Sequence, residues 1–354
     1  MKENCIEMDR RPPQMQDETP YRTRRPLTDA HGRTVSYLRI SVTDRCDLRC
    51  SYCMAKAMRF MSHSDVLKLE EFYRLAAIFM RHGVRKIRIT GGEPLVRKNI
   101  MSLFEMLAPH IDKGDLDEVV LTTNGSQLSR YAAGLYAAGV RRINVSLDSL
   151  DPRRYTDLTR CGDLRKVLAG IDSAQKAGLK VKINAVAMRG SFEREVDDLI
   201  RFAHGHDMDL TLIEEMPLGI VDHDRRKSFL SLAVLEADLR RRWTLMPIAT
   251  STGGPARYVR VSETGGRLGF ITPMSCNFCS ICNRMRLDCT GQLYTCMSNE
   301  GATALRDRLR DGASDHQLGA LIFDALANKP VGHAFAIDRN GVAGIGRHMS
   351  VLGG

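Results

Sequence analysis

Residues 46–53 read Cys46-Asp47-Leu48-Arg49-Cys50-Ser51-Tyr52-Cys53, directly after the apolar run 38–43. Three cysteines at the spacing C-x3-C-x2-C place three thiolate ligands in one loop. A [4Fe-4S] cluster has four irons, so three cysteines leave one iron with an open position that a small molecule can chelate. This stretch therefore predicts a catalytic iron–sulfur site at the end of a first strand.

Two other chemistries fit part of this loop. A structural zinc site takes four protein ligands, often in C-x2-C pairs, and Cys50 with Cys53 alone would suit it. A redox-active C-x-x-C pair is the second alternative, but there the upstream Cys46 has no role. A cluster is the alternative that uses all three cysteines.

The loop, with Tyr52 before its last cysteine, resembles the radical S-adenosylmethionine (SAM) superfamily. The resemblance implies that the open iron holds the amino and carboxylate groups of SAM. It also implies that one electron from the cluster cleaves SAM to a 5′-deoxyadenosyl radical, which abstracts hydrogen from a substrate.

Length and charge limit the remaining possibilities. A chain of 354 residues that is 43% hydrophobic suits one large domain and a smaller one. Its 52 Lys and Arg residues against 42 Asp and Glu give a net charge of +10, which favours anionic partners. Basic blocks interleaved with aromatic residues are absent, so nucleic acid is not expected as a partner. No apolar run approaches the ~20 residues of a membrane span, so a membrane is not expected either.

The first 26 residues carry charge and proline without periodicity, which predicts a disordered extension over 1–26. This segment lacks the apolar core of a signal peptide, and its acidic residues are unlike a transit peptide. The ten cysteines are therefore expected to be reduced thiols of a cytoplasmic protein.

From Thr34 onward, short β-like runs alternate with helical patterns. Strands are predicted at 38–43, 86–90, 118–122, 142–147, 180–187 and 209–214. Helices are predicted between them, at 68–82, 98–109, 129–138, 165–177 and 193–205. Six right-handed strand–helix units favour an α/β fold, an incomplete (β/α)6 barrel over 27–245. The alternation then fades into a helix at 229–243 and a small antiparallel region at 249–272, and we assign 246–354 to a smaller C-terminal domain.

Polar residues and glycines gather at the ends of the predicted strands, where such barrels hold their chemistry. They are Gly91-Gly92-Glu93-Pro94 after the second strand, Thr122-Thr123-Asn124-Gly125 after the third, and Ser146 with Asp148 at the fourth. Each motif alone is an ordinary turn. Their common position on one rim, together with Cys46–Cys53, predicts a single active site.

A second cysteine group lies near residue 280. Cys279, Cys282 and Cys296 have the spacing C-x2-C-x13-C, which suits a second cluster or a structural zinc knuckle with Cys276 or Cys289 as fourth ligand. Arg284 and Arg286 follow, and an extended backbone would point both to the same side. Two guanidinium groups on one face suit a phosphate or a purine edge, although a lone R-x-R is usually surface charge.

Taken together, these motifs resemble the GTP 3′,8-cyclase family, also called molybdenum cofactor biosynthesis protein A. The similarity covers all but the first 26 residues. It rests on the stretches Leu27-Thr28-Asp29, 39–46, 90–94, 122–125, 144–148, 182–186, 214–217, 278–287 and the terminal 349–354. The paired cysteine motifs, Asn283-Arg284-Met285-Arg286 and the Gly-Gly terminus are its specific features.

The resemblance implies a ligand set. The first cluster would bind SAM, and the second, in the C-terminal domain, would leave an iron open to guanine. The implied SAM contacts are Tyr52, Gly92, Ser146 and Met216. The implied GTP contacts are Arg39, Arg88, Thr122, Lys182, Arg284, Met285 and Arg286. Gly353 and Gly354, otherwise a frayed end, would be catalytic residues of a tail that enters the barrel.

The implied reaction begins with hydrogen abstraction from C3′ of GTP. The C3′ radical attacks C8 and yields 3′,8-cyclo-7,8-dihydro-GTP, the first intermediate of molybdopterin synthesis. Implied partners are an external electron donor of flavodoxin or ferredoxin type and, by hand-over of product, cyclic pyranopterin monophosphate synthase. The chain itself is expected to be a homodimer or a monomer.

Two residues depart from the family pattern. Asp47 stands in place of asparagine, which is expected to change the loop's charge and little else. Cys276 adds a ferredoxin-like cysteine that, as a fourth ligand, would block guanine. The rival functions are a peptide-modifying radical SAM enzyme with two clusters, which Asn283-Arg284-Met285-Arg286 and the Gly-Gly terminus argue against, and an iron–sulfur electron carrier. SAM cleavage stimulated by GTP would separate all three.

Overall fold

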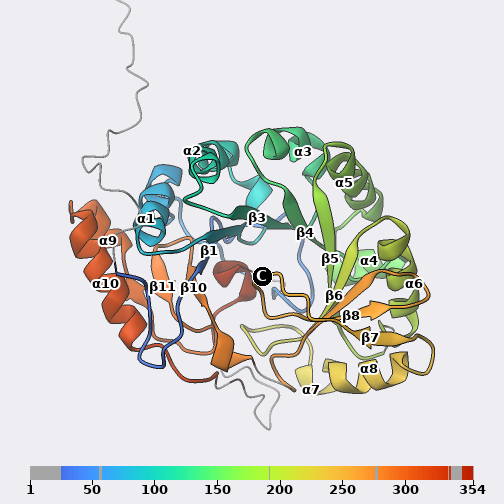
Figure 1. Ribbon diagram of the computed structural model, residues 1–354. Coiled ribbons are helices and arrows are strands. Elements are labelled where there is room, and N and C mark those ends of the chain that lie inside the picture. Colours follow the sequence, from blue (N-terminus) through green and yellow to red (C-terminus); the bar gives the residue numbers. More distant parts are fainter. Residues whose placement is uncertain are drawn as a thin grey trace, which may run out of the picture.

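The computed structural model describes residues 25–55, 58–190, 192–275, 278–333, 335 and 345–353. Its centre is a ring of six parallel strands surrounded by helices (Figure 1). These strands are β1 (Tyr37–Ser41), β2 (Lys86–Thr90), β3 (Glu118–Thr123), β4 (Arg142–Ser146), β5 (Lys180–Ala187) and β6 (Asp209–Glu214). The α/β fold and parallel sheet expected from the sequence are confirmed.

Helices follow the strands and cover the outside of the ring (Figure 1). They are α1 (Leu69–Arg81), α2 (Ile100–Asp112), α3 (Leu128–Ala137), α4 (Pro152–Thr159), α5 (Leu164–Lys176) and α6 (Phe192–Gly205). Apolar periodicity explains them: Val196, Leu199, Ile200 and Ala203 of α6 are all buried against the sheet. Asp151 and Asp163 accept backbone N–H bonds at the starts of α4 and α5.

The last third of the chain adds strands to both edges of the same sheet. They are β7 (Leu245–Pro247), β8 (Arg257–Val261), β9 (Arg267–Ile271), β10 (Arg284–Leu287), β11 (Gln292–Tyr294) and β12 (Thr303–Ala304). The twelve strands lie in the order β12-β11-β10-β1-β2-β3-β4-β5-β6-β9-β8-β7. The antiparallel region expected at 249–272 is the β8–β9 hairpin, but β9 also pairs in parallel with β6. At the other edge, β10 pairs in parallel with β1.

The remaining helices follow β6 in the sequence. They are α7 (Arg225–Ser228), α8 (Leu232–Leu239), α9 (Arg306–Arg310), α10 (Asp315–Ala327) and α11 (Met349–Leu352), with 3-10 turns at Pro94–Val96 and Cys279–Ile281. Helix α8 covers only part of the helix expected at 229–243, and the sequence analysis did not include α4 or α10.

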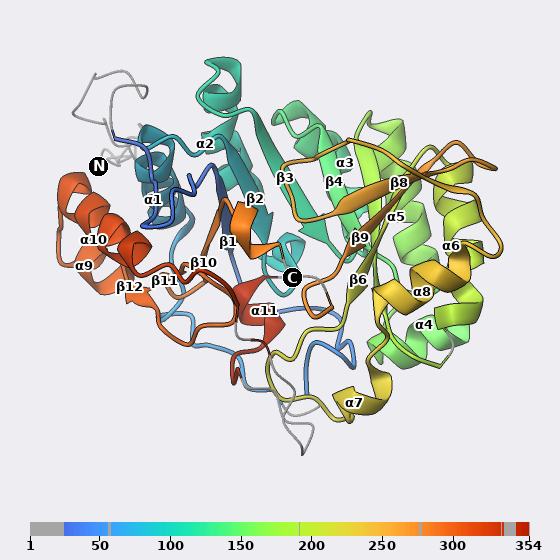
Figure 2. The same ribbon diagram turned by 60° about the horizontal axis from the view of Figure 1, so that its bottom comes forward.

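Helix α11, near the C-terminal end of the described chain, lies inside the ring of strands (Figures 1 and 2). A parallel bridge between Leu218 and Ile345 holds the tail, and Leu352 is fully buried beside Leu218 and Tyr294. Residues 1–24 of the expected extension lie outside the described residues. Within the described ranges, no helix combines the length and apolar character needed to cross a membrane.

Candidate functional site

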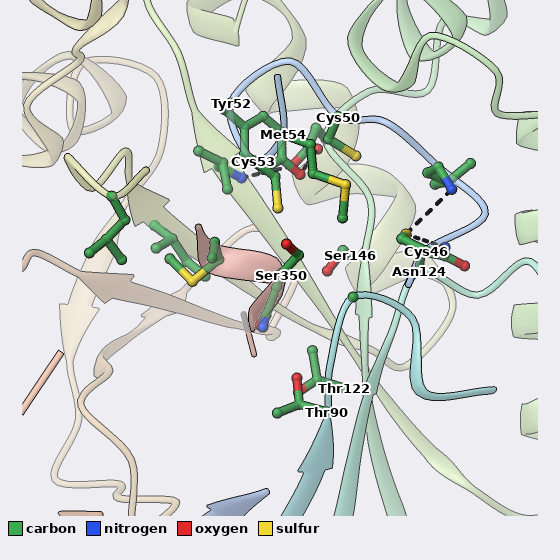
Figure 3. Close-up of a pocket in the computed structure, with 18 of the residues that line it drawn as sticks. Cys46, Cys50, Tyr52, Cys53, Met54, Thr90, Thr122, Asn124, Ser146 and Ser350 are labelled. Atoms are coloured by element: carbon green, nitrogen blue, oxygen red, sulfur yellow. Dashed lines mark hydrogen bonds between the residues drawn. The ribbon is translucent and has the colours of Figure 1, made fainter. Parts of the chain in front are cut away.

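The first cysteine motif opens onto a cavity of about 160 Å³ at the C-terminal ends of the strands. Figure 3 shows Cys46, Cys50 and Cys53 along one side of it, with Ser146 and Ser350 nearby. Every residue expected to contact SAM also lines this cavity: Tyr52, Gly92, Ser146 and Met216. The structure thus brings together residues from four separate motifs that the sequence placed on one rim.

The thiols of this motif lie in apolar surroundings. Burial raises the pKa of Cys46 and Cys53 to about 12, and it raises the pKa of Cys50 well above its usual value. All three are therefore neutral thiols near pH 7, and binding iron must displace their protons. Among the described residues, no three His, Cys, Asp or Glu side chains are grouped closely enough to hold a single metal ion.

Gly92 forms a close contact in the wall of this cavity. Its N–H donates to the carbonyl of Thr43 at 2.7 Å, and a Cβ added at Gly92 would lie 2.4 Å from the carbonyl oxygen of Arg45. Glycine is required here because the loop that leads into Cys46 passes directly over it. The Gly-Gly motif is therefore more than a turn: it sets the distance between β2 and the cysteine loop.

Acidic side chains line this first cavity, and none of the lining residues that the structure describes is Lys or Arg. Asp148 accepts a hydrogen bond from Tyr52 Oη at 2.7 Å, and burial raises the pKa of Asp148 to about 6. Glu214 and Glu215 lie on the same wall. A cavity with this lining suits a ligand that carries positive charge, as SAM does on its sulfonium and ammonium groups.

Asp47 ties two loops of the site together. Its Oδ1 accepts from Asn124 Nδ2 at 2.7 Å, and its Oδ2 accepts from Ser126 Oγ at 2.6 Å and Gln127 Nε2 at 3.2 Å. These bonds join the cysteine loop to the loop after β3, whereas the expected effect of aspartate in place of asparagine stays a prediction. Nothing local in the sequence signals this contact.

A second cavity of about 170 Å³ lies against the second cysteine motif. Cys279, Cys282 and Cys296 line it, as do Arg39, Arg88, Thr122, Lys182, Arg284 and Arg286. Met285 does not: its side chain is buried in the core on the opposite face of β10, because alternate residues of a strand point to opposite faces. Cys276 lies outside the described residues.

Positive charge dominates this second cavity, which no Asp or Glu lines among the described residues. Burial and the nearby Arg88 and Arg142 lower the pKa of Lys182 to about 7. Burial raises the pKa of Tyr37, but Arg88, Arg39 and Lys86 outweigh burial and bring it down to about 7. Such a cavity suits a polyanion.

The thiols of the second motif differ from those of the first. Burial raises the pKa of the Cys279 thiol. It also raises that of Cys282, but the positive charges of Lys329 and Arg284 outweigh burial, so the pKa of Cys282 is lowered. Two buried amide oxygens at the cavity, on Asn144 and Asn184, have no hydrogen-bond partner and could bind a ligand's N–H groups.

The two cavities adjoin. Thr122, Asn184, Ile213, Met216 and Met349 line both. The tail reaches the boundary between them: the carbonyl of Gly353 accepts from Arg286 Nη1 at 2.8 Å and from Arg39 Nη2 at 3.3 Å. Gly354 lies outside the described residues. One site with two compartments is the result.

Curated relatives match nearly the whole chain. A protein of Rhizobium etli (strain CIAT 652) named GTP 3′,8-cyclase is 58% identical over 330 residues, which is 93% of this chain and 94% of the relative. A protein of the same name from Agrobacterium fabrum is 56% identical over 93% of this chain and 95% of its own length. The chain belongs to the GTP 3′,8-cyclase family.

Family models match two regions of this chain. The radical SAM superfamily matches residues 40–203, and Molybdenum Cofactor Synthesis C matches residues 208–335. Solved structures support the fold: Streptococcus suis SuiB bound to S-adenosylmethionine has a TM-score of 0.58 and 16% identity, over 82% of this chain and 69% of SuiB. Native anSMEcpe with bound AdoMet has a TM-score of 0.56 and 15% identity, over 83% of this chain and 81% of anSMEcpe.

The sequence analysis assigned no role to several residues that the structure places at the site. They are Tyr37, Asn144, Asn184, Lys329 and Ser350. Tyr37 lies inside a strand with no motif of its own, whereas Asn144 begins the stretch 144–148, which was matched to the family without a role for Asn144. Lys329 and Ser350 are far in sequence from the cysteines they approach, so only the folded chain reveals them.

Proposed function

We propose that the chain converts GTP to (8S)-3′,8-cyclo-7,8-dihydroguanosine 5′-triphosphate, the first step of molybdenum cofactor biosynthesis. The observation that carries the proposal is the pair of adjoining cavities. Each is lined by a three-cysteine motif, but one has acidic walls and the other cationic walls. This arrangement suits SAM on one side and a nucleoside triphosphate on the other, with the reacting groups at the shared boundary.

Two [4Fe-4S] clusters would be held by Cys46, Cys50 and Cys53, and by Cys279, Cys282 and Cys296. The donor sets fit, because three thiols line each cavity without a fourth cysteine among the described lining residues. With both clusters and SAM bound, the site would supply one-electron cleavage of SAM and hydrogen abstraction from C3′ of GTP. Bonding of C3′ to C8 would then need one further electron and a proton to give the 7,8-dihydro product, and the electrons would come from an external donor.

The chain's own residues bind and orient the substrate. Arg88 and Lys182 offer positive charge to the triphosphate, and Arg284, which lies over the Phe278 ring, and Arg286 point from β10 into the same cavity. Gly353 and the apolar residues before it close the barrel near the boundary. By excluding water and fixing the sugar, they would protect the reaction from side products.

The decisive experiment is anaerobic reconstitution with iron and sulfide, followed by measurement of 5′-deoxyadenosine with and without GTP. Strong stimulation by GTP, with cyclised nucleotide as product, is the expected result. Cleavage of SAM without GTP dependence would favour a peptide-modifying enzyme. No cleavage under any condition, with both clusters present, would favour an electron carrier.

The proposal extends to location and partners. We place the enzyme in the cytoplasm, where thiols stay reduced, as a monomer or homodimer. Electrons would come from a flavodoxin or ferredoxin, and the product would pass to cyclic pyranopterin monophosphate synthase.

Replacing Arg286 with alanine is expected to weaken GTP binding by about 1.5–3 kcal/mol, because a charge-assisted hydrogen bond is lost. That is roughly a 10- to 150-fold increase in Kd. Equilibrium binding of GTP to the reconstituted protein measures this Kd. Arg284→Ala should raise the Kd for GTP by a similar factor. The matched control is Arg260→Ala, which removes an exposed arginine from β8 outside the cavity. Unchanged affinity in the two β10 variants would refute their role.

Binding of GTP at about pH 8 is expected to take up protons. Lys182 and Tyr37 both have a pKa of about 7, so both are largely deprotonated at that pH. The negative triphosphate raises both pKa values and so draws protons from solvent, whereas at about pH 6 both groups are already protonated and little uptake remains. Calorimetry in buffers of different ionisation heat measures the uptake.

Lys182→Arg tests the assignment of this uptake. Arginine keeps the charge but does not titrate in this range, so up to one proton of the uptake at about pH 8 should disappear, while Tyr37 supplies the remainder. The unaltered chain in the same buffers corrects for protons exchanged by the nucleotide itself. Equal uptake in both proteins would exclude Lys182 as the group that titrates.

A further inference from the structure

Lys329 lies beside the second cysteine motif and belongs to no motif that the function has used. It follows α10 by two residues, and only 3% of its surface is exposed. Its Nζ donates to Cys282 Sγ at 3.4 Å, to the carbonyl of Arg284 at 3.0 Å and to the carbonyl of Thr295 at 2.6 Å. An ammonium group has three protons, and these three acceptors account for all of them.

Among the described residues, no carboxylate forms an ion pair with Lys329. Of the three acceptors that bond its ammonium group, the sulfur of Cys282 is the only one that can carry a negative charge. A buried cation without a counter-ion is costly. Thiolate ligands and a cluster at Cys282 would supply the missing negative charge.

The position of Lys329 also links the two parts of the cysteine motif. Thr295 directly precedes Cys296, and Arg284 begins β10 two residues after Cys282. By bonding both carbonyls, the ammonium group spans from the C-x2-C loop to the strand end that carries the third cysteine. It therefore fixes the distance between the segments that carry Cys282 and Cys296, which are fourteen positions apart in sequence.

We propose that Lys329 is a positioning residue of the second cluster, which fixes its cysteine ligands and makes the cluster easier to reduce. The inference rests on the proposed second cluster. Hydrogen bonds to sulfur and nearby positive charge both raise the reduction potential of an iron–sulfur cluster, because an added electron is stabilised. Binding of the anionic GTP would have the opposite effect, and Lys329 is placed to offset it.

Arg33 provides a contrast within the same region. Its Nη1 donates to the carbonyls of Cys279 and Val331, both at 2.9 Å, so it too ties the segment after α10 to the cysteine loop. However, its Nε pairs with Asp29 at 2.6 Å, and it contacts no sulfur in the described contacts. A purely structural role for this region would make Arg33 and Lys329 equivalent, whereas our proposal makes them different.

The test uses the full chain, reconstituted with iron, in the variants Lys329→Gln and Lys329→Met. Glutamine keeps hydrogen-bond donors without charge, and methionine keeps only the length. Iron content is measured first, and then the two reduction potentials by titration followed by electron paramagnetic resonance. The signal perturbed by GTP reports the second cluster, and the signal perturbed by SAM reports the first. Arg33→Gln and Lys176→Gln are controls, the latter removing an exposed lysine of α5.

In Lys329→Gln, the ratio of reduced to oxidised second cluster at a fixed potential should fall at least tenfold, equivalent to a shift of about 59 mV for one electron. The first cluster should not shift, nor should either cluster in the two controls. Lys329→Met should lower the potential and also lose iron from the second site. An unchanged potential with full iron in both Lys329 variants would overturn the proposal.

Two further results are distinguishable. Loss of iron from both sites, with a lower melting temperature in Lys329→Gln and Arg33→Gln alike, would also overturn the proposal and make Lys329 a general structural residue. If the unaltered chain itself binds only about four irons rather than about eight, the second cluster is absent and the proposed function fails instead.

Discussion

Replacing Cys50 with alanine is expected to abolish SAM cleavage while the chain stays folded. Cys50 is one of three thiols around the first cavity, and burial raises its pKa well above its usual value. Changes to residues that only support metal ligands cost about 10- to 100-fold, and removal of a ligand should cost more. The measurement is 5′-deoxyadenosine formed per chain after reconstitution, with iron content and melting temperature determined alongside.

Cys161→Ala is the matched control. Cys161 is exposed, and its thiol hydrogen-bonds the carbonyl of Asp47 at 3.3 Å, so it touches the same loop without lining the cavity. Its loss should leave both iron content and SAM cleavage near those of the unaltered chain. Substantial cleavage by the Cys50 variant, or equal loss in both variants, would contradict the ligand assignment.

Deleting Gly353 and Gly354 is expected to reduce the cyclised product at least 100-fold, on the scale at which a misplacement of about 1 Å reduces catalysis. Both clusters and most of the GTP affinity should survive. The reason is geometric: the Gly353 carbonyl bonds Arg39 and Arg286, and the backbone N–H of Ser350 bonds Cys53 Sγ. The tail thus contacts Cys53 of the first cysteine motif and two arginines of the second cavity at once.

A single substitution tests the backbone conformation at Gly353 without shortening the tail. Gly353 has φ +78°, and a Cβ there would lie 2.2 Å from Thr90 Cγ2, so Gly353→Ala should also lose most of the product. Gly346→Ala is its control, since the nearest atom to an added Cβ is a side-chain oxygen of Glu300 at 3.9 Å. Quantifying product and 5′-deoxyadenosine with GTP gives both results. Full turnover of the deletion variant would mean that the tail is only a frayed end.

Much of the barrel could be predicted from the sequence because each strand is a short β-branched run that ends in a turn. The predicted strand 180–187 agrees with β5, and 209–214 agrees with β6. Helices α4 and α10 were missed for different reasons. Helix α4 is a polar segment directly after a strand end, and only its Tyr155 and Thr159 are buried, so it has no apolar periodicity. Helix α10 lies in a region without the strand–helix alternation that marked the other helices.

The site was predictable where a motif is contiguous. The prediction needed only spacing for Cys46–Cys53, and strand alternation for Arg284 with Arg286. The same alternation turns the side chain of Met285 away from the second cavity, and a GTP contact at Met285 stays a prediction. Contacts across the fold were not predictable in this way. Asp47 bonds the loop after β3, some 80 positions later in sequence, and Lys329 reaches Cys282 from 47 positions away. Such pairs follow from how the sheet is ordered, which no local pattern encodes.

The pairing of β10 with β1 has a consequence for how the protein is made. A ribosome completes β1 through β6 long before it reaches residue 284, so the newly made barrel carries β1 as an unpaired edge. Helix α11 and Gly353 follow β10 in the chain, so they too are made after β1 through β6. We therefore expect a fragment that ends after β6 to leave both the β1 edge and the first cysteine loop uncovered.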